Sequence, residues 1–247
     1  MIFLCLIVIF SFVLMHVIEM ISFGSRVAGR VTRRVALGTT LQQTIYTTSR
    51  FLLIPFLPTL GYLVESGIMI NDYLILVISA FILTFFMSIF VIVGLNKLQH
   101  FFQVVFNKYT NKTTIPTAIL RALIDNKLSF DFKSCNSFSK EKIIFKKVIV
   151  SFIAYLFLIT GFFVAFMLAI MYPENRLTLS QFTATFHGFG AIIVAFYLDP
   201  MLSRSIDNRT DDVVWLNNVY SILLGRSLSY LAIILLVSVF LLLKMFF

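Results

Sequence analysis

Long apolar runs dominate this chain and decide what it can fold into. Several stretches, each long enough to cross the roughly 30 Å hydrocarbon layer of a bilayer as an α-helix, follow one another between polar segments. We predict six membrane spans, at residues 2–23, 36–64, 73–95, 148–171, 177–202 and 215–243. The expected fold is therefore all-α, a polytopic membrane protein with a single transmembrane domain over residues 1–247.

Composition supports this class and narrows the partners. Hydrophobic residues make up 60% of the chain, whereas roughly 45–50% is usual in soluble domains. A net charge of +9 would suggest a nucleic-acid partner in a soluble protein. Here we assign the charge to cytoplasmic loops, where Lys and Arg accumulate, and expect no nucleic-acid partner.

The positions of the positive charges predict the orientation. The first loop contains Arg26, Arg30, Arg33 and Arg34, and the third loop, 96–147, is also rich in cations. The second and fourth loops carry few charges. The positive-inside rule places loops one and three in the cytoplasm, so we expect both termini outside.

The third loop begins with an amphipathic pattern. Its apolar residues recur at helical spacing, while polar residues such as Gln99 and Lys108 fill most of the other face. We predict an amphipathic helix in the cytoplasmic interface, and a flexible basic surface segment at 129–142. The apolar positions are Leu98, Phe101, Phe102, Val105, Phe106 and Tyr109.

This loop divides the spans into two sets of three. An odd number per half gives the halves opposite orientations, as in transporters built from inverted repeats. Residues 40–48, TLQQTIYTT, resemble residues 178–186, TLSQFTATF. We therefore predict two inverted three-helix halves, although so short a window leaves chance similarity open.

Charged residues inside the spans are the strongest functional signal. A charge near the bilayer centre costs at least about 2.5–3.5 kcal/mol on insertion scales. Arg50 lies near the middle of the second span, and Gln43 and Thr47 share its helical face. This polar stripe favours a cation facing a cavity. The alternative is an arginine neutralised by one buried carboxylate for packing.

The first span carries a polar face of its own. His16, Glu19 and Arg26 follow one another at spacings of three and seven residues, which is one helical face. Glu19 can neutralise Arg50 or a first-loop arginine, and it can also carry a proton. His187, in the middle of the fifth span, is expected to be a hydrogen-bonded packing residue or a proton site.

Two more charges complete the set. Arg226 lies inside the sixth span, and Asp199 ends the apolar run of the fifth span, where it can pair with Arg226 or with first-loop arginines. The interior therefore tends towards net positive charge and predicts an anionic ligand. Arginine's planar fork suits phosphate oxygens, so an anionic lipid head group is the simplest candidate.

Other site chemistries lack a motif. No cluster has metal-ligand spacing, and no glycine-rich loop of the ATP-binding kind is present. Cys5 and Cys135 suggest neither a disulfide nor a metal site. We expect no metal and no cofactor.

Four stretches carry a resemblance to a known family. They are HVIEMISFGSRVAGRVTRRVAL at 16–37, TTSRFLLIPFLPTLG at 47–61, LDP at 198–200 and GRSLSYLAIILL at 225–236. These stretches are similar to the Amj family, alternate lipid II flippases of bacterial inner membranes. Spans three and four resemble nothing in particular.

The resemblance implies a function in cell-wall biogenesis and cell shape. Lipid II, the undecaprenyl-pyrophosphate-linked disaccharide-pentapeptide of peptidoglycan synthesis, would move from the inner to the outer leaflet of the bacterial cytoplasmic membrane. Its head group needs cations and a wet groove, while its tail can stay among membrane lipids. The positions that resemble the family are His16, Glu19, Arg26, Gly29, Ser49, Arg50, Asp199, Pro200 and Arg226.

Residue roles follow as a hypothesis. Arg26 and Arg30 would capture the pyrophosphate at the inner mouth, and Arg50 and Arg226 would hold it part-way. Glu19 and Asp199 would keep those arginines positioned. Membrane potential or proton antiport through Glu19 would drive transport, and six spans are few for a large cavity, which leaves room for a homodimer.

Three other functions remain open at this point. A membrane enzyme acting on polyprenyl phosphates would use His16 and Glu19 as its acid–base pair. A small-solute or proton-coupled transporter would use His16, Glu19 and His187 as proton sites. A structural partner in cell-envelope assembly would need none of these residues for chemistry.

Overall fold

The computed structural model describes residues 1–109, 113–124, 143–208 and 211–246. Within these ranges the chain forms helices and no strand. The predicted flexible segment 129–142 lies outside the described residues, as does Cys135. The all-α prediction is confirmed for the part of the chain that the structure describes.

Among the described residues, five helical stretches are long and apolar enough to cross a membrane: Ile2–Val31, Ile70–Val93, Phe145–Met171, Pro173–Asp207 and Asp212–Lys244. Their helices are α1 (Ile2–Ile21), α2 (Phe23–Val31), α5 (Ile70–Val93), α8 (Phe145–Met171), α9 (Arg176–Ile193), α10 (Asp199–Asp207) and α11 (Asp212–Phe246). The protein is thus a multi-pass membrane protein. These stretches correspond to predicted spans one, three, four, five and six.

The predicted second span is interrupted. It consists of α3 (Val35–Ser49), a 3-10 turn (Arg50–Leu52) and α4 (Leu53–Glu65). Pro55 cannot donate a backbone N–H, and its ring crowds the preceding turn, which accounts for the irregularity at that point. Neither α3 nor α4 alone meets the length of a span. A sixth crossing therefore stays a prediction.

The predicted first loop is mostly helix. Arg26 and Arg30 lie in α2, which continues α1 after a break at Ser22, and only 32–34 connect α2 to α3. The chain stays helical because Phe23 and Val27, one turn apart, bury on the same face. The expectation that both arginines lie in a loop was wrong. The two charges made the segment look polar, so its buried apolar residues were not recognised as one face of a helix.

Two glycines let α2 and α3 touch backbone to backbone. A Cβ atom at Gly38 would lie 2.8 Å from Gly29 Cα and 2.7 Å from the Ser25 carbonyl oxygen. Ser25 Oγ also donates a 3.1 Å hydrogen bond to the Gly38 carbonyl. This close crossing fixes α3 beside the arginines of α2.

A helix is present where the amphipathic pattern predicts one. α6 (Leu95–Lys108) follows α5 after Gly94, and a second helix that we did not predict, α7 (Ile115–Ile124), packs against it. Gln99, assigned to the polar face, is buried. The assignment was wrong because α6 lies against both α2 and α7. Its place in a cytoplasmic interface stays a prediction.

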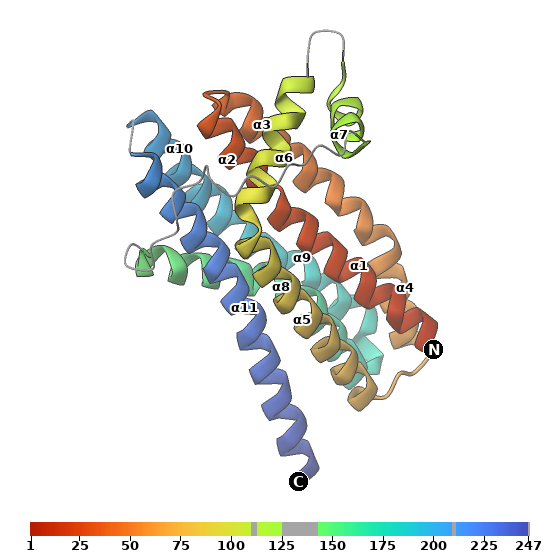
Figure 1. The fold of residues 1–247 in the computed structure, drawn as a ribbon. Coiled ribbons are helices and arrows are strands. Elements are labelled where there is room, and N and C mark those ends of the chain that lie inside the picture. Colours follow the sequence, from red (N-terminus) through yellow and green to blue (C-terminus); the bar gives the residue numbers. More distant parts are fainter. Residues whose placement is uncertain (110–112, 125–142, 209–210, 247) are drawn as a thin grey trace.

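The helices have two distinct ends. α2, α6, α7 and α10 gather at one end, and both termini lie at the other (Figure 1). α8 packs between α9 and α11, while α1 packs against α4 and α5. At the centre, the Phe12 ring lies 5.1 Å from Phe81 and 4.9 Å from Phe163, measured between centroids. This aromatic layer supports the polar residues of α1 from one side.

The close crossing of α2 and α3 predicts that substitution of glycine by alanine changes the stability of the protein differently at two positions. Gly38→Ala should destabilise the protein by about 1–3 kcal/mol, because the added methyl group meets backbone atoms that cannot yield. Gly188→Ala, in α9, meets open space and should be neutral or stabilising by up to about 1 kcal/mol. Thermal unfolding in detergent measures both, and equal midpoints for the two variants would refute the close crossing.

Candidate functional site

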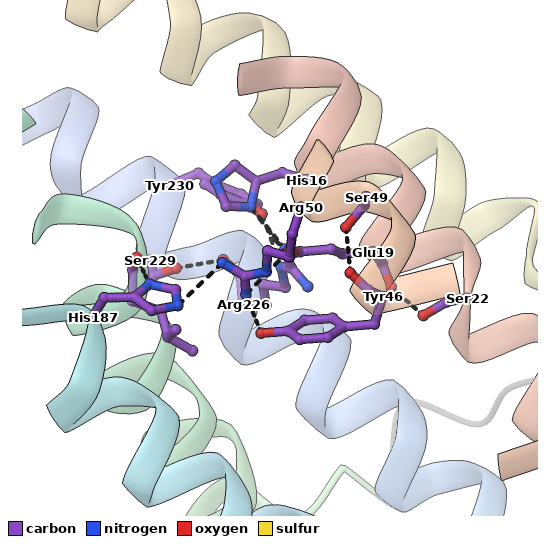
Figure 2. Close-up of polar contacts among 11 residues, drawn as sticks. His16, Glu19, Ser22, Tyr46, Ser49, Arg50, His187, Arg226, Ser229 and Tyr230 are labelled. Atoms are coloured by element: carbon purple, nitrogen blue, oxygen red, sulfur yellow. Dashed lines mark hydrogen bonds and ion pairs between the residues drawn. The ribbon is translucent and has the colours of Figure 1, made fainter. Parts of the chain in front are cut away.

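One carboxylate lies at the centre of the polar contacts inside the helices (Figure 2). Glu19 comes from α1, and Arg226 Nη2 on α11 donates a 2.5 Å hydrogen bond to Glu19 Oε2. Arg50 Nη2, in the 3-10 turn, lies 3.4 Å from Glu19 Oε1. We call these three residues, with His16 and His187, the Glu19 cluster.

The Glu19 cluster has an excess of positive charge. Arginine remains protonated in proteins, so two guanidinium groups face one carboxylate. Among the described residues, the ion pairs of Arg50 and Arg226 are both with Glu19. With both histidines neutral, the cluster carries one net positive charge. It lies deep, since Arg226 is about 21 Å along α11 from its first residue.

Both histidines contact an arginine through a ring nitrogen. His16 Nδ1 lies 2.9 Å from Arg226 Nη2, and His187 Nε2 lies 3.1 Å from Arg50 Nη1. A guanidinium can only donate, so each of these ring nitrogens accepts. His187 Nδ1 is then free to donate to the Leu158 carbonyl at 3.2 Å. This bonding pattern is that of neutral imidazoles.

Arg50 is the accessible cation of the cluster. Its side chain is 21% exposed, against 1% for Arg226. Arg50 Nη2 donates to the hydroxyl of Tyr46, one turn earlier, and the guanidinium carbon lies 4.6 Å from the centre of the Tyr46 ring. Through His187 the same guanidinium reaches α9. Arg50 thus joins the broken helix α3–α4 to α9 and keeps part of its surface open.

Arg226 is enclosed on every side. Arg226 Nε donates a 2.9 Å hydrogen bond to the Tyr230 hydroxyl, and its guanidinium carbon lies 4.5 Å from the centre of the Tyr155 ring. Its Nη1 is buried without a hydrogen-bond partner. We expected Arg226 to face a cavity, and in this structure it does not, because Glu19 and two tyrosines surround it.

A second polar group lies nearer the end where α2 and α10 meet. Arg26 Nη1 donates to Asp199 Oδ1 at 2.9 Å and to Gln42 Oε1 at 3.3 Å, and Arg26 Nη2 donates to Ser203 Oγ at 3.4 Å. Arg26 is buried while Asp199 stays partly exposed. The predicted pairing of Asp199 with a first-loop arginine is confirmed in this form.

Arg30 makes a parallel bridge. Its Nε donates a 2.7 Å hydrogen bond to Asp212 Oδ1, and its guanidinium carbon lies 5.6 Å from the Trp215 ring centre. Arg26 and Arg30 therefore connect α2 to α10 and α11. Both were predicted to capture the pyrophosphate at the inner mouth, and in this structure both are held in ion pairs.

Gln43 does not join these contacts. Gln43 and Thr47 are exposed on α3, whereas the neighbouring Gln42 is buried beside Arg26. Regular α-helix over the residues between them places Gln43 close to the face of Arg50, but the longer side chain of Arg50 is the one that reaches Glu19 and His187. Sequence reasoning missed Gln42 and Tyr46, although the four-residue spacing of Tyr46 and Arg50 was a usable signal.

The two related stretches end close together. TLQQTIYTT lies in α3 just before Arg50, and TLSQFTATF lies in α9 just before His187. The contact between Arg50 and His187 therefore joins the ends of the two stretches. An inverted relation between the halves stays a prediction.

Sharing of one carboxylate by two arginines predicts an unequal response to substitution. Glu19→Gln should destabilise the protein by about 3–5 kcal/mol, because it leaves buried arginine charge without compensation. The double variant Glu19→Gln with Arg226→Met should recover part of that loss. Thermal unfolding in detergent gives the difference, with Glu65→Gln, at the exposed end of α4, as the matched control.

Equal stability of Glu19→Gln and Glu65→Gln would contradict the central position of Glu19. A double variant less stable than Glu19→Gln alone would contradict the pairing with Arg226.

Comparison with known families places the chain. A family model described as Amj, alternate to MurJ, matches residues 11–243. Comparisons with curated proteins and with solved structures gave no significant match. The family match includes the Glu19 cluster and the ion pairs of Arg26 and Arg30. It also includes the third and fourth predicted membrane spans, for which the sequence offered no motif. The chain belongs to the Amj family.

Proposed function

We propose that this protein is a lipid II flippase, which moves the undecaprenyl-pyrophosphate-linked peptidoglycan precursor from the inner to the outer leaflet of the bacterial cytoplasmic membrane. Membership of a family described as alternate to MurJ supports this function. The observation that carries it is the net positive charge of the Glu19 cluster, part of which is accessible at Arg50. A buried cation of this kind favours a phosphate-bearing ligand that enters the membrane.

Arg50 is the proposed holding site. A guanidinium forms two parallel hydrogen bonds with phosphate oxygens, and these are among the stronger hydrogen bonds in proteins. The present partners of Arg50 are weaker competitors than a pyrophosphate, since Tyr46 and His187 are uncharged and Glu19 is shared with Arg226. A bound pyrophosphate would neutralise the excess charge without removing Glu19 from Arg226.

Arg26 and Arg30 form the proposed inner gate. Their bonds to Asp199 and Asp212 tie α2 to α10 and α11. A pyrophosphate arriving at this end competes with the two carboxylates for the same guanidinium groups. Arg26 and Arg30 therefore bind the head group as they release the helices, and Asp199 and Asp212 pull the gate closed after the head group has passed.

Arg226 has a later role in this scheme. It contacts the substrate only after Glu19 has shifted towards Arg50, because in the enclosed arrangement Tyr155, Tyr230 and Glu19 leave no access. Arg226 mainly keeps Glu19 in place. Glu19 prevents the two arginines from gripping the pyrophosphate too tightly.

Six crossings complete the proposal. Both termini lie at the same end of the helices (Figure 1), which supports an even number of crossings. In the part of the chain that the structure describes, five helices meet the length and hydropathy of a span. The broken helix of α3 and α4 supplies the sixth, with its irregular turn at the charged site. Broken helices at a mid-membrane binding site are typical of transporters.

Membrane potential is the favoured driving force. Each negative charge that moves outward gains about 2.3 kcal/mol per 100 mV. Proton antiport through Glu19 is less suitable, because a protonated Glu19 would leave Arg50 and Arg226 without a counter-charge. The same contacts disfavour a proton-coupled solute transporter, since protonated His16 and His187 would each add positive charge beside an arginine.

The polyprenyl-phosphate enzyme has less support. Its acid–base pair would be His16 and Glu19, and both side chains are enclosed by Arg226 and the aromatic layer. Across the described ranges, no group of three or more potential metal ligands occurs.

Complementation tests the proposed function. In a cell depleted of its principal lipid II flippase, expression of this protein should restore lipid II at the outer surface, measured by labelling or cleavage of exposed lipid II. Arg50→Ala should lower the initial rate by about 10- to 100-fold, because a charge-assisted hydrogen bond contributes about 1.5–3 kcal/mol. The initial rate of Arg50→Lys should lie between those of the wild-type protein and Arg50→Ala, because lysine keeps the charge but cannot form two parallel hydrogen bonds.

Arg121→Ala is the matched control, because Arg121 is an exposed arginine on α7. Protein levels in the membrane are compared by immunoblot. Full exposure of lipid II with Arg50→Ala at wild-type abundance would remove Arg50 from the mechanism. No restoration by the wild-type protein would reject the function itself.

A further inference from the structure

An apolar pocket lies on the other side of the aromatic layer from the Glu19 cluster. It has a volume of about 430 Å³ and is formed by α5, α8 and α11, with one side chain from α9. The lining is almost entirely hydrocarbon and aromatic. It includes Val77, Phe81, Phe163, Ile233, Leu236 and Phe240.

The pocket opens sideways, towards the membrane. Phe157, Leu236 and Phe240 line it and are also exposed on the outside of the helices. A pocket with such a rim in a membrane-spanning protein faces hydrocarbon rather than water. Apolar cavities do not hold ordered water, because water finds no polar partners there. Its natural occupant is the hydrocarbon chain of a lipid.

The pocket shares a wall with the charged site. The Phe81 ring lies 6.3 Å from the Tyr230 ring, and the Tyr230 hydroxyl accepts the hydrogen bond from Arg226. On the α9 side, Phe186 lines the pocket and is followed directly by His187. One layer of aromatic side chains therefore separates a cation-rich site from an apolar pocket.

The pocket also has a defined position along the helices. Its α11 residues run from Ala232 to Phe240, and so lie beyond Arg226 towards the C-terminus. Lys244 Nζ, further along, donates a 2.8 Å hydrogen bond to Asn71 Oδ1 at the beginning of α5. The pocket therefore lies between the Glu19 cluster and the end that carries both termini.

We propose that this pocket holds the prenyl chain of the transported lipid, at the isoprene units next to the pyrophosphate. The proposal rests on the flippase function and adds a second binding site for the same molecule. A lipid with its pyrophosphate at the Glu19 cluster has the first part of its chain within reach of this wall. A bulk phospholipid lacks that connection, so we assign the pocket to the substrate.

The pocket also assigns a direction. With the termini outside, it lies in the outer half of the membrane, and the ion pairs of Arg26 and Arg30 tie α2 to α10 and α11 at the inner end. The prenyl chain therefore occupies the pocket late in transport, and leaves through the sideways opening between α8 and α11, where the exposed lining residues lie.

Binding by native mass spectrometry tests the pocket on the purified full-length protein. The probes are lipid II with its full undecaprenyl chain and a short-chain lipid II analogue with a single isoprene unit, which is too short to fill the pocket. The wild-type protein should bind the long-chain probe at least about tenfold more tightly, because burial of two methylene groups already accounts for that factor. An excess of phosphatidylglycerol should not displace it.

Pocket-filling variants supply the decisive comparison. Ala232→Phe and Val237→Phe each enlarge a lining side chain on α11 and should abolish the preference for the long chain, while binding of the short-chain probe stays within about twofold. Leu235→Phe, on the exposed side of α11, should keep the preference. Thermal unfolding shows whether each variant is folded. If one filling variant does not fold, the other still gives the comparison.

The two proposals fail differently. Two results would contradict the proposed role of the pocket and leave the flippase function intact. One is transport by a wild-type protein that binds both probes equally, and the other is an unchanged preference for the long-chain probe in both folded filling variants. Displacement by phosphatidylglycerol would assign the pocket to bulk lipid and overturn it too. Failure to bind either probe, together with failed complementation, would reject both proposals.

Discussion

The sharing of Glu19 by Arg50 and Arg226 organises this protein. Three elements far apart in sequence, α1, the turn after α3, and α11, meet because two guanidinium groups need the same carboxylate inside an apolar bundle. Removing one partner from a buried pair costs several kcal/mol, so the contact fixes the helices as well as the charge. One positive charge of the Glu19 cluster stays uncompensated, part of it exposed at Arg50, and the proposed function rests on this charge.

Irregular helices place the charges that matter. Arg50 lies in a 3-10 turn shortly before Pro55, and Asp199 follows a π-helical stretch, Val194–Leu198, at the bond before Pro200. In both cases the proline prevents the regular hydrogen-bond ladder from passing through that position. Such local irregularities are frequent at functional sites. At these two irregular positions Arg50 contacts His187 of α9, and Asp199 contacts Arg26 of α2.

Much of the fold could be predicted from the sequence, because length and hydropathy determine which segments enter a membrane. The charged residues at Glu19, Arg50, Asp199 and Arg226 could be found for the same reason, since each violates that rule. Their partners were harder. Gln43 was chosen because its spacing from Arg50 puts both on one helical face, whereas Gln42 contacts Arg26 on another helix. The enclosure of Arg226 depends on Tyr155, from a helix that no sequence pattern relates to α11. Long-range packing of this kind leaves no local signal.

The central claim is that Arg50 carries an uncompensated charge which binds a pyrophosphate lipid. Binding of undecaprenyl pyrophosphate and of uncharged undecaprenol to the purified protein, each measured by native mass spectrometry with and without the substitution Arg50→Gln, tests this most directly. The account predicts strong binding of the pyrophosphate, weak binding of the alcohol, and loss of the difference in Arg50→Gln. Equal affinity of the wild-type protein for both lipids, or an unchanged preference in Arg50→Gln, would contradict it.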